Sequence, residues 1–276
     1  MAIDVELTAD PARVLRRAGQ FLESDPVRHN LILTLLHGRA SNPGEGRYLI
    51  ATDGEDVVGV VFQSPLTYIA TITPMDSEAV RACVELLGAN AAASLPGVNG
   101  EAATAARFAG QWTERTKSAA IPEYGQRIYE AGRITEPQRV AGQFRRAIED
   151  DTDLLGEWLG AFSAEVHEPP GDPRAVVSRR IAEGEFWIWE DDCPVSMAAL
   201  TKSVAGVARV QAVYTPPDSR GRGYASACVA RLSSNTLRAG TRCILYTDLA
   251  NPVSNSVYRR IGYSAVAECL LYKFQG

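Results

Sequence analysis

The chain has 276 residues, which suggests one large or two small domains at roughly 100–200 residues per domain. Apolar residues make up 46% of it and charged residues 22%, the balance of an ordinary globular protein. The net charge of −5 and the pI near 5.4 argue against the broad basic surface of a nucleic-acid-binding protein, so no nucleic-acid partner is expected.

Cysteine usage and the start of the chain point to a reducing compartment. The cysteines are odd in number and contain no Cys-x-x-Cys pair, which predicts reduced thiols rather than a disulfide framework or a metal site. Residues 1–17 are too polar for a signal peptide, and no apolar run approaches the ~20 residues that span a bilayer. We therefore expect a cytoplasmic protein without a membrane partner.

The first half of the chain mixes helical and strand-like patterns. Asp53-Gly54 between two apolar runs is typical of a hairpin turn. In order, the expected elements are a helix over 11–37 that breaks near Pro26, strands at 48–52, 57–63 and 67–73, helices over 77–93 and 101–115, and a strand at 126–133.

A polar linker, residues 135–142, separates this half from a second series of elements. The expected elements are a strand at 144–148, helices over 154–166 and 174–183, a hairpin of 186–190 and 195–201, a strand at 207–214, a helix over 224–238, a strand at 243–247, a helix over 252–261 and a strand at 265–274. Because the two halves share this outline, we predict a pseudo-repeat of one α/β unit.

The chemistry-bearing segment follows the strand at 207–214. Two glycines, Gly221 and Gly223, precede an amphipathic helix, and glycine lets backbone N–H groups approach an anion closely. A helix start adds uncommitted N–H donors and the positive end of the helix dipole. With charge-assisted bonds from Arg220 and Arg222, the segment predicts a phosphate or pyrophosphate cradle.

Three kinds of phosphate loop compete for this segment. A Walker loop is excluded because no Gly-Lys-Ser/Thr is present. A dinucleotide loop is nearly matched by Gly221-x-Gly223-x-x-Ser226, with Asp248 about where the ribose-binding acid lies. That pattern needs its first glycine directly after the strand, however, and residues 216–220 intervene here.

The third kind fits better, because the segment resembles motif A of the Gcn5-related N-acetyltransferase (GNAT) family. The family signature Gln/Arg-x-x-Gly-x-Gly/Ala is met by Arg220, Gly223 and Ala225, and residues 213–216 resemble its strand end. Downstream, residues 251–263 resemble motif B. There Asn251, Asn255 and Tyr258 share one helix face, with Asn251 as a good N-cap.

The resemblance covers about residues 143–276, and the whole chain resembles tandem GNAT proteins whose N-terminal half is degenerate. It implies an α/β (α+β) fold of two GNAT-like domains, 1–135 and 143–276, each a mixed, mostly antiparallel twisted sheet flanked by helices. In the first half, residues 67–73 are followed by Pro74-Met75-Asp76 without the glycine signature. We expect this half to lack a working pyrophosphate cradle.

The resemblance also implies a chemistry, namely direct attack of an amine on acetyl-CoA. Coenzyme binding would fall to three strand residues, to the glycine loop and helix start, and to two asparagines: Val213, Tyr214, Thr215, Arg220, Gly221, Arg222, Gly223, Tyr224, Ala225, Ser226, Asn251 and Asn255. The pantetheine would lie in a splayed gap between the strands at 207–215 and 243–247. Backbone N–H groups at 213–215 would polarise the thioester, and Tyr258 would protonate the leaving thiolate.

The general base stays open. Many relatives carry a glutamate on the strand that here holds Gln211, which cannot accept a proton at neutral pH. The candidates are Glu165, His167, Glu168 and Asp248, alongside a water chain.

Two other functions remain alternatives: an acyl-CoA-binding regulatory module without turnover, and a dinucleotide-dependent oxidoreductase. The expected partner is a small-molecule amine or a peptide. A homodimer stays open.

Overall fold

The structure is a computed structural model that describes residues 3–89, 95–166 and 171–276. The chain forms two compact units. Unit 1 comprises Met1–Ile128, Asp248–Ala250 and Val266–Gly276, and unit 2 comprises Tyr129–Thr247 and Asn251–Ala265.

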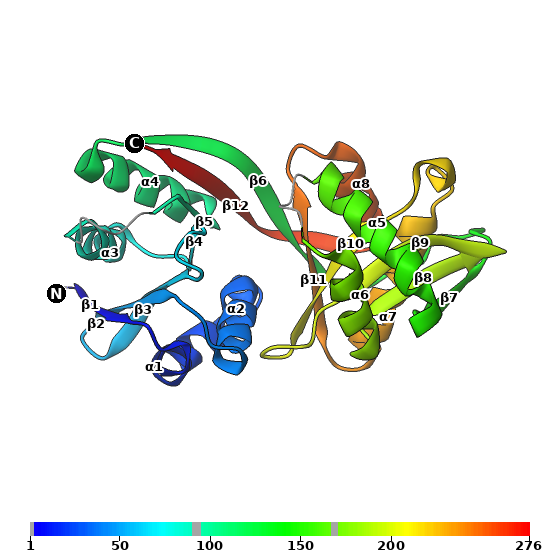
Figure 1. Ribbon diagram of the computed structural model, residues 1–276, viewed down its shortest axis with the longest axis horizontal. Helices are drawn as coiled ribbons and strands as arrows, with labels where there is room; N and C mark the ends of the chain where they lie inside the picture. Colours follow the sequence, from blue (N-terminus) through cyan, green and yellow to red (C-terminus); the bar gives the residue numbers. More distant parts are fainter. Residues whose placement is uncertain (1–2, 90–94, 167–170) are drawn as a thin grey trace. The chain divides into compact units, whose positions relative to one another are not determined.

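Unit 1 is a sheet with helices on both faces (Figure 1). Its elements are β1 (Ile3–Thr8), α1 (Pro11–Ser24), α2 (Asn30–Ser41), β2 (Arg47–Asp53), β3 (Asp56–Gln63), β4 (Ala70–Ile72), α3 (Ser77–Ala89), β5 (Gly97–Glu101), α4 (Ala102–Thr116) and most of β6 (Ala119–Ala131). The strands lie in the order β1-β2-β3-β4-β5-β12, antiparallel except for the parallel pair β4–β5. Helices α3 and α4 pack on one face around Cys83, Phe108 and Trp112.

Unit 2 repeats this order of elements. They are β7 (Gln143–Arg146), α5 (Thr152–Glu165), α6 (Pro173–Ala182), β8 (Phe186–Asp191), β9 (Cys193–Leu200), β10 (Val207–Tyr214), α7 (Tyr224–Arg238), β11 (Arg242–Asp248), α8 (Pro252–Arg260) and the start of β12 (Tyr263–Gln275). The strands lie in the order β6-β11-β10-β9-β8-β7, in which β10 and β11 are parallel and β7 to β10 are antiparallel.

The two faces of the unit 2 sheet carry separate cores. On one face α7 packs through Cys228, Val229 and Leu232. On the other face α5 and α6 pack through Leu155 and Val177. Side chains of β10 divide between these cores, because a strand directs successive residues to opposite faces. The site described below is built where β10 ends and α7 begins.

The last strand of each repeat, β6 or β12, is divided between the two units. Residues Cys269–Lys273 of β12 pair with Gly97–Glu101 of β5 in unit 1, whereas β6, from the first repeat, lies next to β11. The compact units therefore divide the chain differently from the predicted ranges 1–135 and 143–276, because strand pairing overrides position along the sequence. The functional roles given to those two ranges stay predictions.

The predicted fold class is confirmed: both units are mixed, mostly antiparallel sheets flanked by helices. The predicted break near Pro26 separates α1 from α2. Two strands were missed, β1 and β5. The first alternates apolar and charged residues at the polar chain start, and the second contains two glycines, which weaken a strand signal.

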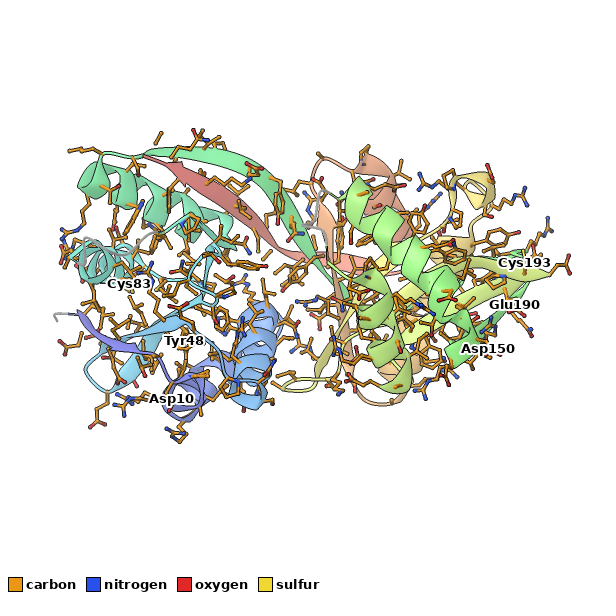
Figure 2. The ribbon with its side chains drawn as sticks, in the orientation of Figure 1. Asp10, Tyr48, Cys83, Asp150, Glu190 and Cys193 are labelled. Atoms are coloured by element: carbon orange, nitrogen blue, oxygen red, sulfur yellow. The ribbon has the colours of Figure 1, made fainter. Side chains whose placement is uncertain are left out.

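The five cysteines, Cys83, Cys193, Cys228, Cys243 and Cys269, are free thiols, with Cys83 on α3 and Cys193 at the β8–β9 turn (Figure 2). Burial raises the pKa of the Cys83 thiol to about 12, so this side chain behaves as a small core residue. None of the helices in the described ranges is both long enough and apolar enough to span a membrane.

Candidate active site

The pairing of β10 with β11 ends before either strand ends. Their parallel ladder joins Val207–Val210 to Arg242–Leu245, whereas β10 runs on to Tyr214 and β11 to Asp248. The register of β10 against β9 shifts between Gln211 and Tyr214, and Ala212 has φ +49°. This is a bulge: an extra residue kinks the strand and redirects its backbone groups.

Helix α7 begins without a side-chain cap. Its N-cap, Gly223, has φ +86°, and Gly221 has φ +79°. The first helical bond recorded runs from the Ala227 N–H to the Gly223 carbonyl, so the preceding N–H groups have no partner within the helix. A Cβ on Gly221 would meet nothing within 4 Å, whereas a Cβ on Gly223 would lie 3.2 Å from Cγ2 of Val140. The loop is open to a ligand at the first glycine and packed at the second.

Arg220 is turned back toward the strand that precedes it. Its Nη2 lies 2.5 Å from Oε1 of Glu165, the last residue of α5, and its Nε donates to the Thr215 carbonyl at 2.9 Å. The guanidinium also lies over the Tyr214 ring, 5.7 Å from its centroid. The hydrogen bond that Arg220 donates to Glu165 raises the pKa of Arg220, which therefore stays charged. Arg222 is exposed beside the loop.

The first residues of α7 present their backbone to the loop and pack their side chains elsewhere. Tyr224 is 5% exposed, and its hydroxyl donates to Oδ2 of Asp191 on β8. Ala225 and Ser226 are half-buried. Tyr224 and Ala225 were predicted to bind the coenzyme. Because their side chains pack elsewhere, that prediction now concerns only their backbone N–H groups.

The asparagines of the second motif are committed within unit 2. Asn251 caps α8, with Oδ1 accepting the Ser254 N–H at 2.9 Å. Asn255 is 4% exposed, donates from Nδ2 to the Asn251 carbonyl at 2.7 Å and accepts from the Tyr129 hydroxyl at 3.1 Å. Both side chains hold α8 in place, and that fixes the position of Tyr258 one turn later.

Tyr258 is half-buried between two aromatic rings. Its ring centroid lies 6.4 Å from that of Tyr129 and 6.0 Å from that of Tyr263. Burial raises the pKa of the Tyr258 hydroxyl to about 12, so the group keeps its proton at neutral pH. Within the described part of the chain no hydrogen bond to this hydroxyl is recorded, so the O–H is available to an incoming acceptor.

The proposed bases are already engaged or fall outside the description. Glu165 pairs with Arg220, and Asp248 accepts the Ala250 N–H at 2.7 Å in a tight turn. Asp248 belongs to unit 1, whereas Tyr258 belongs to unit 2. His167 and Glu168 lie outside the described residues.

Gln211, on the strand where the resemblance led us to look for a glutamate, has a partner that the sequence did not suggest. With its amide turned to suit its neighbours, Oε1 accepts from Nη1 and Nη2 of Arg180 at 3.0 and 2.7 Å. Arg180 lies on α6 and is 8% exposed. The sequence of α6 is half apolar with basic residues in its last turn, and this pattern does not indicate that Arg180 is buried.

Comparison with known proteins gives one family model and a set of similar folds. Residues 195–271, which include β10, α7, β11 and α8, match the family model FR47-like protein. None of the curated proteins matches the chain.

Among solved structures, an acetyltransferase of the GNAT family from Colwellia psychrerythraea is similar over 100% of both chains, with a TM-score of 0.61 and 12% identity. A GCN5-related N-acetyltransferase from Sphaerobacter thermophilus covers 98% of this chain and 94% of its own, with a TM-score of 0.61 and 13% identity. A tandem GNAT protein from the clavulanic acid biosynthesis pathway covers 98% of both chains, with a TM-score of 0.56 and 10% identity. At these identities the likeness is one of fold.

Proposed function

We propose that this chain, which carries a GNAT-related FR47-like domain over residues 195–271 and has the fold of the GNAT acetyltransferases, transfers the acetyl group of acetyl-CoA to an amine. Acetyl-CoA supplies the activated acetyl group. The chain's own residues bind and orient it, polarise its carbonyl and move protons.

The observation that carries the proposal is the uncapped start of α7. Backbone N–H groups at Tyr224, Ala225 and Ser226, with the positive end of the helix dipole, suit the coenzyme's pyrophosphate. The positive φ of Gly221 and Gly223 forms a turn that other residues adopt only with strain. Arg222, exposed at the same loop, adds a cation.

The acyl end of the coenzyme is assigned to the diverging strands. Past Val210 and Leu245, β10 and β11 no longer share the recorded ladder, so pantetheine can pair with β10 there. N–H groups at Val213–Thr215 then polarise the thioester carbonyl. Tyr214, buried beside Trp158, forms the apolar wall of this end.

Tyr258 is the proposed acid. The acceptor nitrogen forms a bond to the acetyl carbon while the carbon–sulfur bond breaks, and the sulfur takes the tyrosine's proton. The acceptor's own proton leaves through Glu165 or water, and a proton from solvent restores the tyrosine. The acceptor is an amine of a small molecule or a peptide.

The test is a binding and turnover experiment on the full chain. Calorimetry with acetyl-CoA should give saturable binding, and NAD should give none; the reverse result would make the chain an oxidoreductase. A screen of amines, amino acids and peptide N-termini should then release free thiol. Tight binding without thiol release from any acceptor would favour the regulatory binding module.

A further inference from the structure

We infer that Arg180 and Gln211 form a clamp that positions the β10 bulge for catalysis. The inference rests on the proposed function, because the bulge is the part of β10 that is proposed to face the thioester. Neither residue is proposed to touch the substrate, so both are positioning residues.

The first step is the burial of Arg180. A guanidinium that is 8% exposed needs partners on all sides, since an unpaired buried cation is strongly destabilising. Nε donates to Oε2 of Glu185 at 2.7 Å, and the guanidinium lies 5.0 Å from the centroid of the Phe186 ring. The two terminal nitrogens are left for Gln211.

The second step is charge balance. Arg180 and Glu185 form a compact pair that is only 10% and 13% exposed, so their charges already cancel. The partner at position 211 therefore needs an acceptor oxygen but no charge. Glutamine meets that need, which gives a physical reason for an amide rather than a carboxylate at this position.

The third step is the location of Gln211. It is the last residue of β10 in regular register with β9, paired with Ala199, and the next residue, Ala212, has φ +49°. The other end of the bulge is held separately, because the buried Ser196 hydroxyl donates to the Tyr214 carbonyl at 3.0 Å. Holding the Gln211 side chain against α6 fixes where the strand leaves its ladder and where the following N–H groups point.

The experiment compares two glutamine variants of the full chain. Gln211→Met keeps the side-chain length and removes the acceptor. Gln63→Met is the matched control in unit 1, because Gln63 is 1% exposed and accepts from Nε of Arg47 at 2.5 Å. Each variant leaves one arginine without its glutamine, but only one of the two lies beside the bulge.

Gln211→Met should lower kcat about 10- to 100-fold, the scale of a ~1 Å misplacement of reacting groups, with the Kd for acetyl-CoA within about threefold of wild type. Hydrogen exchange of the amides in residues 211–214 should speed up at least about tenfold. Gln63→Met also loses the hydrogen bonds from Nε2 to the Leu66 and Tyr68 carbonyls, so it should lower the melting temperature at least as much while leaving kcat within about twofold. Parallel losses of kcat and coenzyme affinity, or unchanged exchange in residues 211–214, would overturn the clamp.

Gln211→Glu separates positioning from base catalysis. The carboxylate still accepts from the Arg180 fork, so kcat should stay within about fivefold of wild type. A gain of tenfold or more would mean that position 211 acts on the acceptor directly, which also overturns the clamp. If wild type bound no acetyl-CoA, the proposed function would fail, and the exchange result alone would still decide whether the clamp holds the bulge.

Discussion

The two units contain the same turn from a parallel strand into a helix, and the turn is open in one and closed in the other. In unit 2 the N-cap of α7 is Gly223, and no side chain caps the helix. In unit 1 Asp76 precedes α3, and its Oδ1 accepts the N–H groups of Glu78 at 3.0 Å and Ala79 at 2.8 Å. In unit 1 the Asp76 carboxylate thus binds the N–H groups at the helix start, whereas in unit 2 no side chain caps the corresponding N–H groups.

The strands beside these turns also differ between the units: β4 is short and closely packed, whereas β10 is long and bulged. Strand β4 has only three residues, Ala70–Ile72, and a Cβ on Gly100 of the neighbouring β5 would lie 2.5 Å from Cγ1 of Ile72. In unit 2, β10 continues past its ladder with β11 through a bulge. Side chains thus pack closely between β4 and β5 in unit 1 at the point where, in unit 2, the coenzyme is proposed to enter between β10 and β11.

The helices that follow complete the contrast. Tyr258 is the seventh residue of α8, and the seventh residue of α4 is Phe108, which is fully buried and has no hydroxyl. Unit 1 can therefore keep the same fold and a packed core and still lack three features of unit 2: the uncapped helix start, the strand that continues past its ladder, and the tyrosine. This is the physical content of the proposal that the first unit is a degenerate copy.

The largest effect is expected from closing the open turn. Gly223→Val forces a β-branched residue into φ +86° and against Val140, which should weaken acetyl-CoA binding by about 100-fold or more, since several charge-assisted N–H bonds depend on this turn. Calorimetry measures it. Gly240→Val is the control, because Gly240 has φ +78° and open space at the other end of α7. An equal loss of affinity in both variants would remove the loop from the coenzyme site.

Tyr258→Phe gives α8 the residue that α4 carries. Loss of a general acid should lower kcat about 100-fold, with acetyl-CoA affinity nearly unchanged. In wild type, acid function is lost only as pH rises through the tyrosine pKa of about 12, so this group should cause no fall in kcat between pH 7 and 10. Turnover at the wild-type level in the phenylalanine variant would exclude the acid role.

Asp76→Ala opens the closed turn. The cap residue is lost, so the free energy of unfolding should fall by about 1 kcal/mol, measurable by urea denaturation. Acetyl-CoA affinity should not change, because Ile72 packs closely on Gly100 and leaves no room for the coenzyme between β4 and β5 there. A second molecule of acetyl-CoA bound by this variant would show that Asp76 alone keeps unit 1 closed.

The smallest effect is expected at Glu165, which holds Arg220 away from the open turn. The pair is about half exposed, and such pairs contribute at most about 1 kcal/mol. Glu165→Gln should therefore tighten acetyl-CoA binding by up to about fivefold, since Arg220 becomes free to face the pyrophosphate. Weaker binding would indicate that the pair itself supports the loop.

Local patterns along the sequence predicted much of this arrangement. The glycines at 221 and 223, the cap at Asn251 and the spacing to Tyr258 each act within one turn of a helix, so short-range rules suffice for them. The helix break near Pro26 and the hairpin at Asp53-Gly54 are local in the same way.

What the sequence did not disclose depends on tertiary packing. Arg180 meets Gln211, Arg220 meets Glu165, and Tyr129 meets Asn255 across long stretches of chain. No period or cap encodes such pairs. Strand β5 was missed for a similar reason: its glycines are explained by close approach of Ile72 and of the Tyr272 carbonyl rather than by propensity.

The pairing of Cys269–Lys273 with Gly97–Glu101 also bears on how the protein is made. A ribosome delivers residues in order, and domains generally fold as they emerge. Most of unit 1 precedes unit 2 in the sequence, yet its sheet needs residues 266–276, so β5 stays without that neighbour until those residues have been synthesised. Until then the edge of β5 is exposed, and chaperone binding to nascent chains should concentrate there.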